Sequence, residues 1–241
     1  GSACYPSPGV GPGMGRMRLW RHRSLPMCLM RRDYVSTMIT KHGRWAECRD
    51  YVSIWNAAES TAAMAARVFL DAGANIGSCT LEMLVRTSAR VVAFEPSPSN
   101  LFHLTSTLHL AAQQNASFAD RVVVYPVALG ATRGHSRIFT SANLSRGILH
   151  YNSGNSFVAD EPPAGARLSP ALSADVTLWP LDTLLTGERA SEASGARGRL
   201  PAGHRNDDSE ERGMERGASV GSIDPLSVRM LKVRLCTCVH G

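Results

Sequence analysis

The middle of the chain alternates short apolar runs with longer segments of helical periodicity. Apolar runs at 67–73, 90–97 and 120–130 lack a regular exchange of polar and apolar positions, which indicates strands buried on both faces. Segments 79–88 and 99–114 between them place apolar residues at helical spacing. Buried strands separated by helices are typical of βαβ units, so the pattern predicts an α/β fold with a mostly parallel sheet.

The segments of the chain differ in composition and hydrophobic pattern, which suggests how the chain is organised. Residues 33–66 predict a helical amino-terminal segment, and residues 67–186 hold the core with a loop or hairpin rich in Gly, Ser, Asn and Pro. Residues 187–222 have few large apolar groups, which predicts a disordered linker or insertion because they cannot offset their ordering entropy. Residues 223–241 begin with an apolar run that predicts a fourth strand, followed by a divergent tail.

Positive charge is concentrated at the amino terminus. The chain has 241 residues, of which 44% are hydrophobic, so it can bury a substantial core. Its net charge of +6 equals the six arginines of residues 1–32, which contain no acid, while the remaining 20 basic residues are balanced by 20 acids. Residues 1–32 therefore predict a basic disordered leader, and an Arg-rich start without acids is also typical of an organelle transit segment.

Cysteine spacing and hydropathy restrict the expected setting and partners. The six cysteines form no regular framework, so we expect reduced thiols and an intracellular location, cytoplasmic or, with a transit segment, organellar. No run approaches the roughly 18 apolar residues of a membrane span, so no transmembrane segment is expected. Aromatic residues make up 6% of the chain, without the spacing of a base-stacking platform, which disfavours specific nucleic-acid binding.

The stretch VFLDAGANIGSCTLEML, residues 68–84, joins the first core strand to a helix through a glycine turn. The dinucleotide fingerprint needs glycines two and five residues after Gly73, where the chain has Asn75 and Ser78. A phosphate-binding P-loop also needs glycine at position 78. Both patterns fail, so the turn favours a ligand without a pyrophosphate.

A ligand with an amino-acid end and a nucleoside suits the residues that remain. Asp71 can orient a cationic amino group, and Glu95, at the end of the next strand, can accept hydrogen bonds from ribose hydroxyls. S-adenosylmethionine has this shape. The alternative is that Gly73 and Gly77 only allow close packing of strand and helix, and that Asp71 caps the helix.

Five segments in sequence order, FLDAGANIGSCTLEM, VVAFEPSPSNLFHL, VVVYPVALG, WPLDTLL and MLKV, resemble the FkbM-type methyltransferase family. The resemblance covers roughly residues 66–233 and implies a class I, Rossmann-like doubly wound sheet that binds S-adenosylmethionine. It also implies which residues line the cofactor site, with the last of them near the adenine: Asp71, Gly73, Ala74, Asn75, Gly77, Glu95, Pro96 and Ala128.

The chain departs from the family's pattern at its carboxyl end. Family members follow the lysine of the fourth strand with acids, whereas Lys232 and Val233 are followed by Arg234 and Leu235. The sheet is therefore expected to be incomplete, with about four core strands plus a hairpin, and its exposed edge predicts self-association. We expect a chain with this truncated sheet to lack methyltransferase activity.

Two functions remain open at this point. The first is methyl transfer from S-adenosylmethionine to a hydroxyl of a sugar or similar small molecule, as the resemblance implies. The second is a catalytically inactive cofactor-binding or interaction protein, or a fragment of such an enzyme.

The sequence does not identify a catalytic residue. His103, His109 and His150 are candidate bases, although lone histidines are more often packing or surface residues. The polar stretch NSGNS at 152–156 can contact a hydroxylated acceptor or form a plain turn. Cys236, Cys238 and His240 are too few for a structural zinc site, so no metal is expected.

Overall fold

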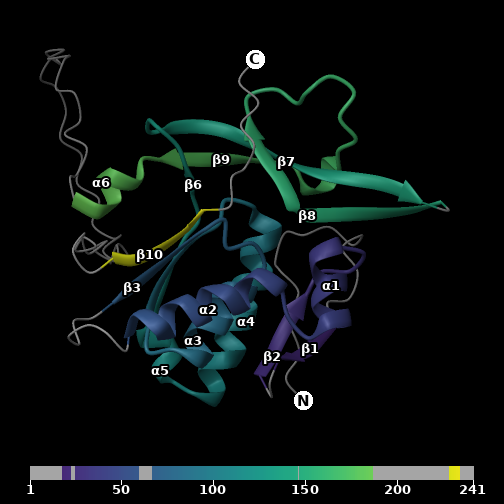
Figure 1. The fold of residues 1–241 in the computed structure, drawn as a ribbon. Coiled ribbons are helices and arrows are strands. Elements are labelled where there is room, and N and C mark those ends of the chain that lie inside the picture. Colours follow the sequence, from purple (N-terminus) through teal and green to yellow (C-terminus); the bar gives the residue numbers. More distant parts are fainter. Residues whose placement is uncertain (1–17, 23–24, 60–66, 146, 187–227, 234–241) are drawn as a thin grey trace, which may run out of the picture.

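The computed structural model describes residues 18–22, 25–59, 67–145, 147–186 and 228–233. At its centre lies a four-stranded sheet in the order β10-β3-β4-β5, with every neighbouring pair parallel (Figure 1). The predicted α/β class and parallel sheet are thus present. The strands are β3 (Val68–Ala72), β4 (Arg90–Phe94), β5 (Val122–Tyr125) and β10 (Val228–Val233).

The strand order reverses at β3. From β3 the chain passes to β4 and then β5 on one side, and later returns with β10 on the other side of β3. In open α/β sheets such a reversal marks a crevice at the carboxyl ends of the strands, where ligands bind. The described sheet therefore has one such position, after β3 and β10.

The helices between these strands form where the periodicity predicts them. Helix α3 (Ser78–Arg86) follows β3, α4 (Pro98–Gln114) follows β4, and the short α5 (Ser117–Asp120) precedes β5. The Ser97 side chain caps α4 by accepting from the Asn100 N–H. Helices α1 (Tyr34–His42) and α2 (Ala46–Glu59) occupy the amino-terminal segment that was expected to be helical.

The two faces of the parallel sheet are covered differently. Phe69, Val91 and Ala93 belong to the larger core, which helices α2, α3 and α4 supply with residues such as Trp55 and Leu104. The opposite face packs in a second cluster under β9 and α6, as described below. In Figure 1 helices α2 to α5 lie below the sheet and the mixed sheet lies above it. Strand β3 and four of the five residues of β4 are buried, as their lack of alternation predicted, whereas β5 is only partly buried, with Val123 exposed.

A second, mixed sheet has the order β6-β9-β7-β8. Two antiparallel 12-residue strands form its long hairpin, so of the loop or hairpin expected within residues 67–186 the hairpin is present. The face of the parallel sheet below it packs Val68, Leu70, Val92 and Phe94 against Leu184 and Trp179. The remaining elements are β6 (Ala128–Leu129), β7 (Gly134–Ser145), β8 (Ile148–Ala159), η1 (Pro170–Leu172), β9 (Ala174–Trp179) and α6 (Leu181–Thr186).

The prediction of a disordered leader is wrong for its second half. Strands β1 (Arg18–His22) and β2 (Leu25–Leu29) form an antiparallel pair. All five residues of β2 are buried, and the Cys28 N–H donates to the Thr107 hydroxyl of α4 at 3.0 Å. Apolar burial against α4 therefore outweighs the composition of the surrounding segment. Residues 1–17, the predicted linker at 187–222 and the tail after 233 lie outside the described residues.

All helices in the described part of the chain are too short or too polar to cross a lipid bilayer.

Candidate functional site

The turn after β3 is fixed to the neighbouring strand by its own backbone. The N–H groups of Gly73 and Ala74 both donate to the Phe94 carbonyl at the end of β4, at 2.9 and 3.0 Å. The Asn75 N–H donates to a Glu95 carboxylate oxygen, and the Ile76 N–H donates to the Asn75 side chain. The last N–H of the turn, on Gly77, donates to the Ala74 carbonyl. All five N–H groups of 73–77 thus have protein acceptors.

Glu95 is buried at the carboxyl end of β4 and joins three segments. Its Oε2 accepts from the Asn75 N–H at 2.7 Å, and its Oε1 accepts from the Ser97 N–H at 2.9 Å and the Asn100 amide at 3.2 Å. Hydrogen bonds to an ionised carboxylate are the stronger kind. The carboxylate therefore orients the turn after β3 and the start of α4 relative to each other.

Asp71 lies within β3 and has no exposed surface. Its Oδ2 accepts from the Thr80 hydroxyl of α3 at 2.7 Å. This bond connects the strand to the helix that follows the turn, close to the capping role that the sequence left open. The carboxylate adds a buried negative charge behind the turn.

Asn75 and the two glycines of the turn adopt left-handed backbone conformations. Gly73 has φ 73°, Asn75 has φ 56° and Gly77 has φ 88°. A Cβ on Gly77 would collide with Leu104 Cδ1 of α4, so this glycine permits the close approach of the turn and α4. Asn75 is the residue type that tolerates this region best after glycine.

A small cavity, with about 10 Å³ of space open to the centre of a water molecule, adjoins the same turn. Val35 and Trp45 of the amino-terminal segment form one side, and residues 74–76, Ser78 and Cys79 form the other. That space holds about one water molecule, far less than the roughly 300 to 1,000 Å³ of a drug-sized ligand site.

The other residues expected at the cofactor site lie in two places. Ala74 is buried in the turn, and Pro96 follows Glu95 before α4. Ala128 lies in β6 and packs with Ile138 and Val176 of the mixed sheet. The structure therefore groups the turn residues with Glu95, whereas Ala128 belongs to a different cluster.

Two polar residues that were not among the expected cofactor-site residues join this site. Asp33, which caps α1, and Ser153 of β8 are both buried. The Ser153 hydroxyl donates to Asn75 Oδ1 at 3.2 Å, and the Ser153 N–H donates to Asp33 Oδ1 at 2.8 Å. Local sequence patterns could not indicate contacts across 78 and 120 residues, although the stretch NSGNS contains Ser153.

Of the three candidate histidines, one is buried near this region. His103 lies in α4, and its Nδ1 hydrogen-bonds with the Ser99 carbonyl at 2.7 Å. Burial lowers the pKa of His103, while the Ser99 bond and the charge of Asp33 partly oppose the shift. Its imidazole is therefore neutral at pH 7. His109 and His150 are exposed.

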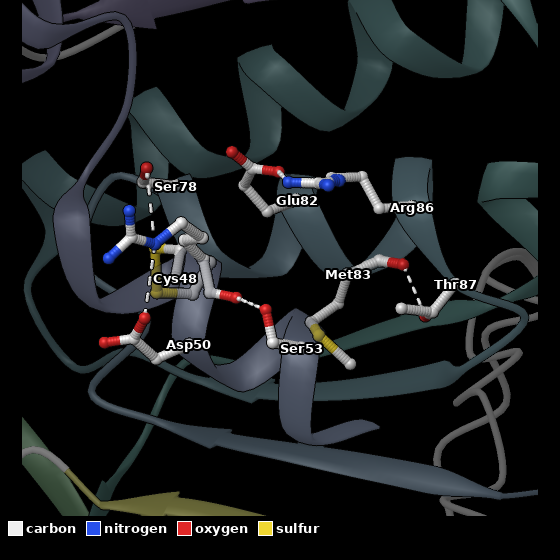
Figure 2. Close-up of polar contacts among 10 residues, drawn as sticks. Cys48, Asp50, Ser53, Ser78, Glu82, Met83, Arg86 and Thr87 are labelled. Atoms are coloured by element: carbon white, nitrogen blue, oxygen red, sulfur yellow. Dashed lines mark hydrogen bonds and ion pairs between the residues drawn. A yellow bond between two sulfur atoms is a disulfide. The ribbon is translucent and has the colours of Figure 1, made fainter. Parts of the chain in front are cut away.

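A disulfide between Cys48 and Cys79 overturns the expectation of reduced thiols for these two residues. Figure 2 shows the bond joining α2 to the start of α3, with the Cα atoms 4.8 Å apart. The two positions are 31 residues apart in the sequence, so their spacing gave no indication of the pair. The predicted intracellular location rested on reduced thiols, so it loses that support.

The same view shows the side chain of Glu82 beside Arg86, one turn later in α3 (Figure 2). Arg86 Nη1 lies 3.7 Å from Glu82 Oε2, and the Glu82 side chain is buried. The described residues contain no cluster of three or more His, Cys, Asp or Glu side chains that could hold a metal ion.

Comparisons with known proteins show limited similarity. No family model and no curated protein matches the chain. Similar solved structures include a Pyrococcus horikoshii protein provisionally described as transferase PH0793, with 18% identity and a TM-score of 0.30 over 46% of this chain and 36% of its own. The methyltransferase FkbM from Methylobacillus flagellatus KT has 22% identity and a TM-score of 0.26 over 39% of this chain and 23% of its own.

Both structures are described as transferases, and this chain spans only 36% and 23% of their lengths. At these TM-scores the similarity carries no argument about function. The case for a function therefore depends on the geometry of the site.

Proposed function

We propose that the chain forms the cofactor-binding part of an S-adenosylmethionine-dependent methyltransferase with a Rossmann-like fold. The observation that carries this proposal is the buried Glu95 carboxylate, which binds the Asn75 N–H of the turn beside the reversal of strand order. Ligands of open α/β sheets bind at such a reversal. An ionised carboxylate accepts hydrogen bonds without donating any, which suits the two hydroxyls of a ribose.

The turn fits this cofactor better than it fits a dinucleotide. Pyrophosphates bind to turns that present a row of backbone N–H groups, whereas all five N–H groups of 73–77 donate within the protein. S-adenosylmethionine has no phosphate, and its amino and sulfonium groups are positively charged. Asp71, in the strand before the turn, and Glu95, which accepts from the Asn75 N–H, supply negative charge next to it.

The protein's own contribution to the reaction is binding and orientation. The bound cofactor supplies an electrophilic methyl group, and transfer requires an acceptor oxygen to be held in line with it. Glu95 would hold the ribose, and the turn would hold the amino-acid end. The proposed acceptor is a hydroxyl group on a sugar or a similar small molecule.

Isothermal titration calorimetry with S-adenosylhomocysteine tests the proposal. We expect Glu95→Gln to weaken binding about 10- to 150-fold, which corresponds to the loss of a hydrogen bond to a charged group. Asn100→Ala is the matched control, because it removes one donor to the same carboxylate but leaves the acid in place. We expect its affinity to stay within about threefold of the parent, since the lost bond is one of several.

Two results would contradict the proposal. One is the absence of binding heat with both S-adenosylhomocysteine and S-adenosylmethionine. The other is equal affinity of the parent and Glu95→Gln, which would remove Glu95 from the site.

A further inference from the structure

Strand β8 contains a bulge at the point where the hairpin approaches the turn after β3. Pairing between β7 and β8 passes from Thr140↔Ser156 directly to Ser141↔Asn152, so residues 153–155 are skipped in the strand register. Bulges of this kind occur next to functional sites, where they redirect a side chain. Here the first residue of the bulge, Ser153, points its hydroxyl at Asn75.

The bulge is held in place on both sides. Its Ser153 N–H donates to Asp33 Oδ1, and its Ser153 carbonyl accepts from the Ser156 hydroxyl at 3.0 Å. On the other side the Asn155 carbonyl accepts from the Ser141 hydroxyl at 3.0 Å. The hairpin is also bonded to the chain just before α1, where the Tyr151 N–H donates to the Arg32 carbonyl at 2.8 Å. The position of the Ser153 hydroxyl is therefore determined by protein contacts.

Asn75 connects the bulge to Glu95. Its side-chain oxygen accepts from both the Ser153 hydroxyl and the Ile76 N–H, and its own N–H donates to Glu95. All three residues are at most 8% exposed, so water does not readily replace a lost partner. Because a left-handed conformation is unfavourable for a residue other than glycine, the surrounding contacts must hold it.

We propose that Ser153 is a positioning residue for the cofactor site. Its hydroxyl holds the Asn75 side chain, Asn75 holds the turn and the Glu95 carboxylate, and the β7–β8 hairpin is thereby coupled to cofactor affinity. This role rests on the proposed function as far as the cofactor is concerned. The positioning of the turn itself is a property of the ligand-free protein.

Two measurements test the coupling. In the ligand-free protein we expect Ser153→Ala to accelerate amide hydrogen exchange at Ile76 about 3- to 30-fold, with Val92 in β4 unchanged, because couplings of this kind modulate sites by that factor. We expect the dissociation constant for S-adenosylhomocysteine to rise by a similar factor. Ser136→Ala is the matched control, because it removes a serine hydroxyl of the same hairpin that contacts Asp160 and not the bulge. It should change neither measurement.

A double-mutant cycle with Asn75→Gly identifies the route of the effect. Glycine adopts the left-handed conformation without strain but lacks the amide that Ser153 contacts. In the Asn75→Gly background, Ser153→Ala should therefore have no further effect on Ile76 exchange or on affinity. Equal exchange at Ile76 in the parent and Ser153→Ala overturns the proposal, as does an undiminished effect of Ser153→Ala in the Asn75→Gly background.

The two measurements also separate this proposal from the proposed function. If the parent does not bind S-adenosylhomocysteine while Ser153→Ala still accelerates exchange at Ile76 alone, Ser153 positions the turn and the assigned cofactor is wrong. If the parent binds the cofactor and Ser153→Ala changes neither readout, the positioning role is wrong and the proposed function stands.

Discussion

Gly77 shows how one residue sets the distance between the turn and its neighbouring helix. It has a left-handed φ of 88°, and an added Cβ would meet the Leu104 side chain of α4. Glycine is thus required here for both conformation and space. The sequence left open whether this glycine serves a ligand or packing. The contact with Leu104 shows a packing role, and a role toward a ligand stays a prediction.

We expect Gly77→Ala to lower the free energy of unfolding by about 2 to 5 kcal/mol, the sum of left-handed strain and overpacking against Leu104. The matched control is Gly43→Ala. Gly43 has a similar φ of 77°, but nothing lies within 4 Å of an added Cβ. Its expected cost is about 1 to 2 kcal/mol, from the conformation alone. Urea denaturation measures both values, and equal costs would contradict the packing role.

For Asn75 the sequence indicated the site to which the residue belongs, but not all of its contacts. The family resemblance implied that Asn75 and Glu95 line one site, and the position of Glu95 at the end of the next strand suited a ribose-binding acid. The structure brings them into direct contact, with the Asn75 N–H 2.7 Å from Glu95 Oε2. The stretch NSGNS, which contains Ser153, was a candidate for acceptor contact, but the bonds of Ser153 with Asn75 and Asp33 could not be predicted because they depend on how the hairpin lies across the turn.

Strands and helices were predictable to different degrees. Strands β3 and β4 are short, apolar and buried on both faces, so their residues alone indicate them. Strands β7 and β8 contain many Ser, Asn and Gly residues, and their length depends on pairing with each other. Strand β2 was missed because its five buried residues lie in an Arg-rich segment whose average composition suggested disorder.

The Cys48–Cys79 disulfide connects helix α2 to α3 just after the turn. A bond that closes a loop of 31 residues lowers the entropy of the unfolded chain. We expect the double substitution Cys48→Ala with Cys79→Ala to lower the free energy of unfolding by about 3 to 4 kcal/mol, measured by urea denaturation without reductant.

Peptide mapping of the unreduced parent provides the control for this prediction. The peptides that carry Cys48 and Cys79 should appear as one linked species and separate on reduction. Alkylation of both thiols in denatured, unreduced protein would contradict the disulfide and restore the expectation of reduced cysteines.

At the scale of the whole molecule, the central sheet depends on a strand that is distant in sequence. Strand β10 follows β5 only after residues 126–227, yet it pairs with β3 along that strand's full length. It creates the reversal of strand order beside the proposed cofactor site. Within the described residues β10 is also one edge of the sheet, which keeps self-association through this edge a prediction.

We expect a chain ending at Thr186 to associate into oligomers and to unfold at lower urea concentration than the full chain. Without β10, the backbone of β3 becomes an unpaired edge next to the buried residues Phe69 and Leu70. Analytical ultracentrifugation measures the association. Because an extended peptide can add a strand to an open edge, a synthetic peptide of residues 226–235 should restore the size distribution of the full chain, whereas a scrambled peptide should not. A shortened chain that matches the full chain in both size and stability would contradict the place of β10 in this sheet.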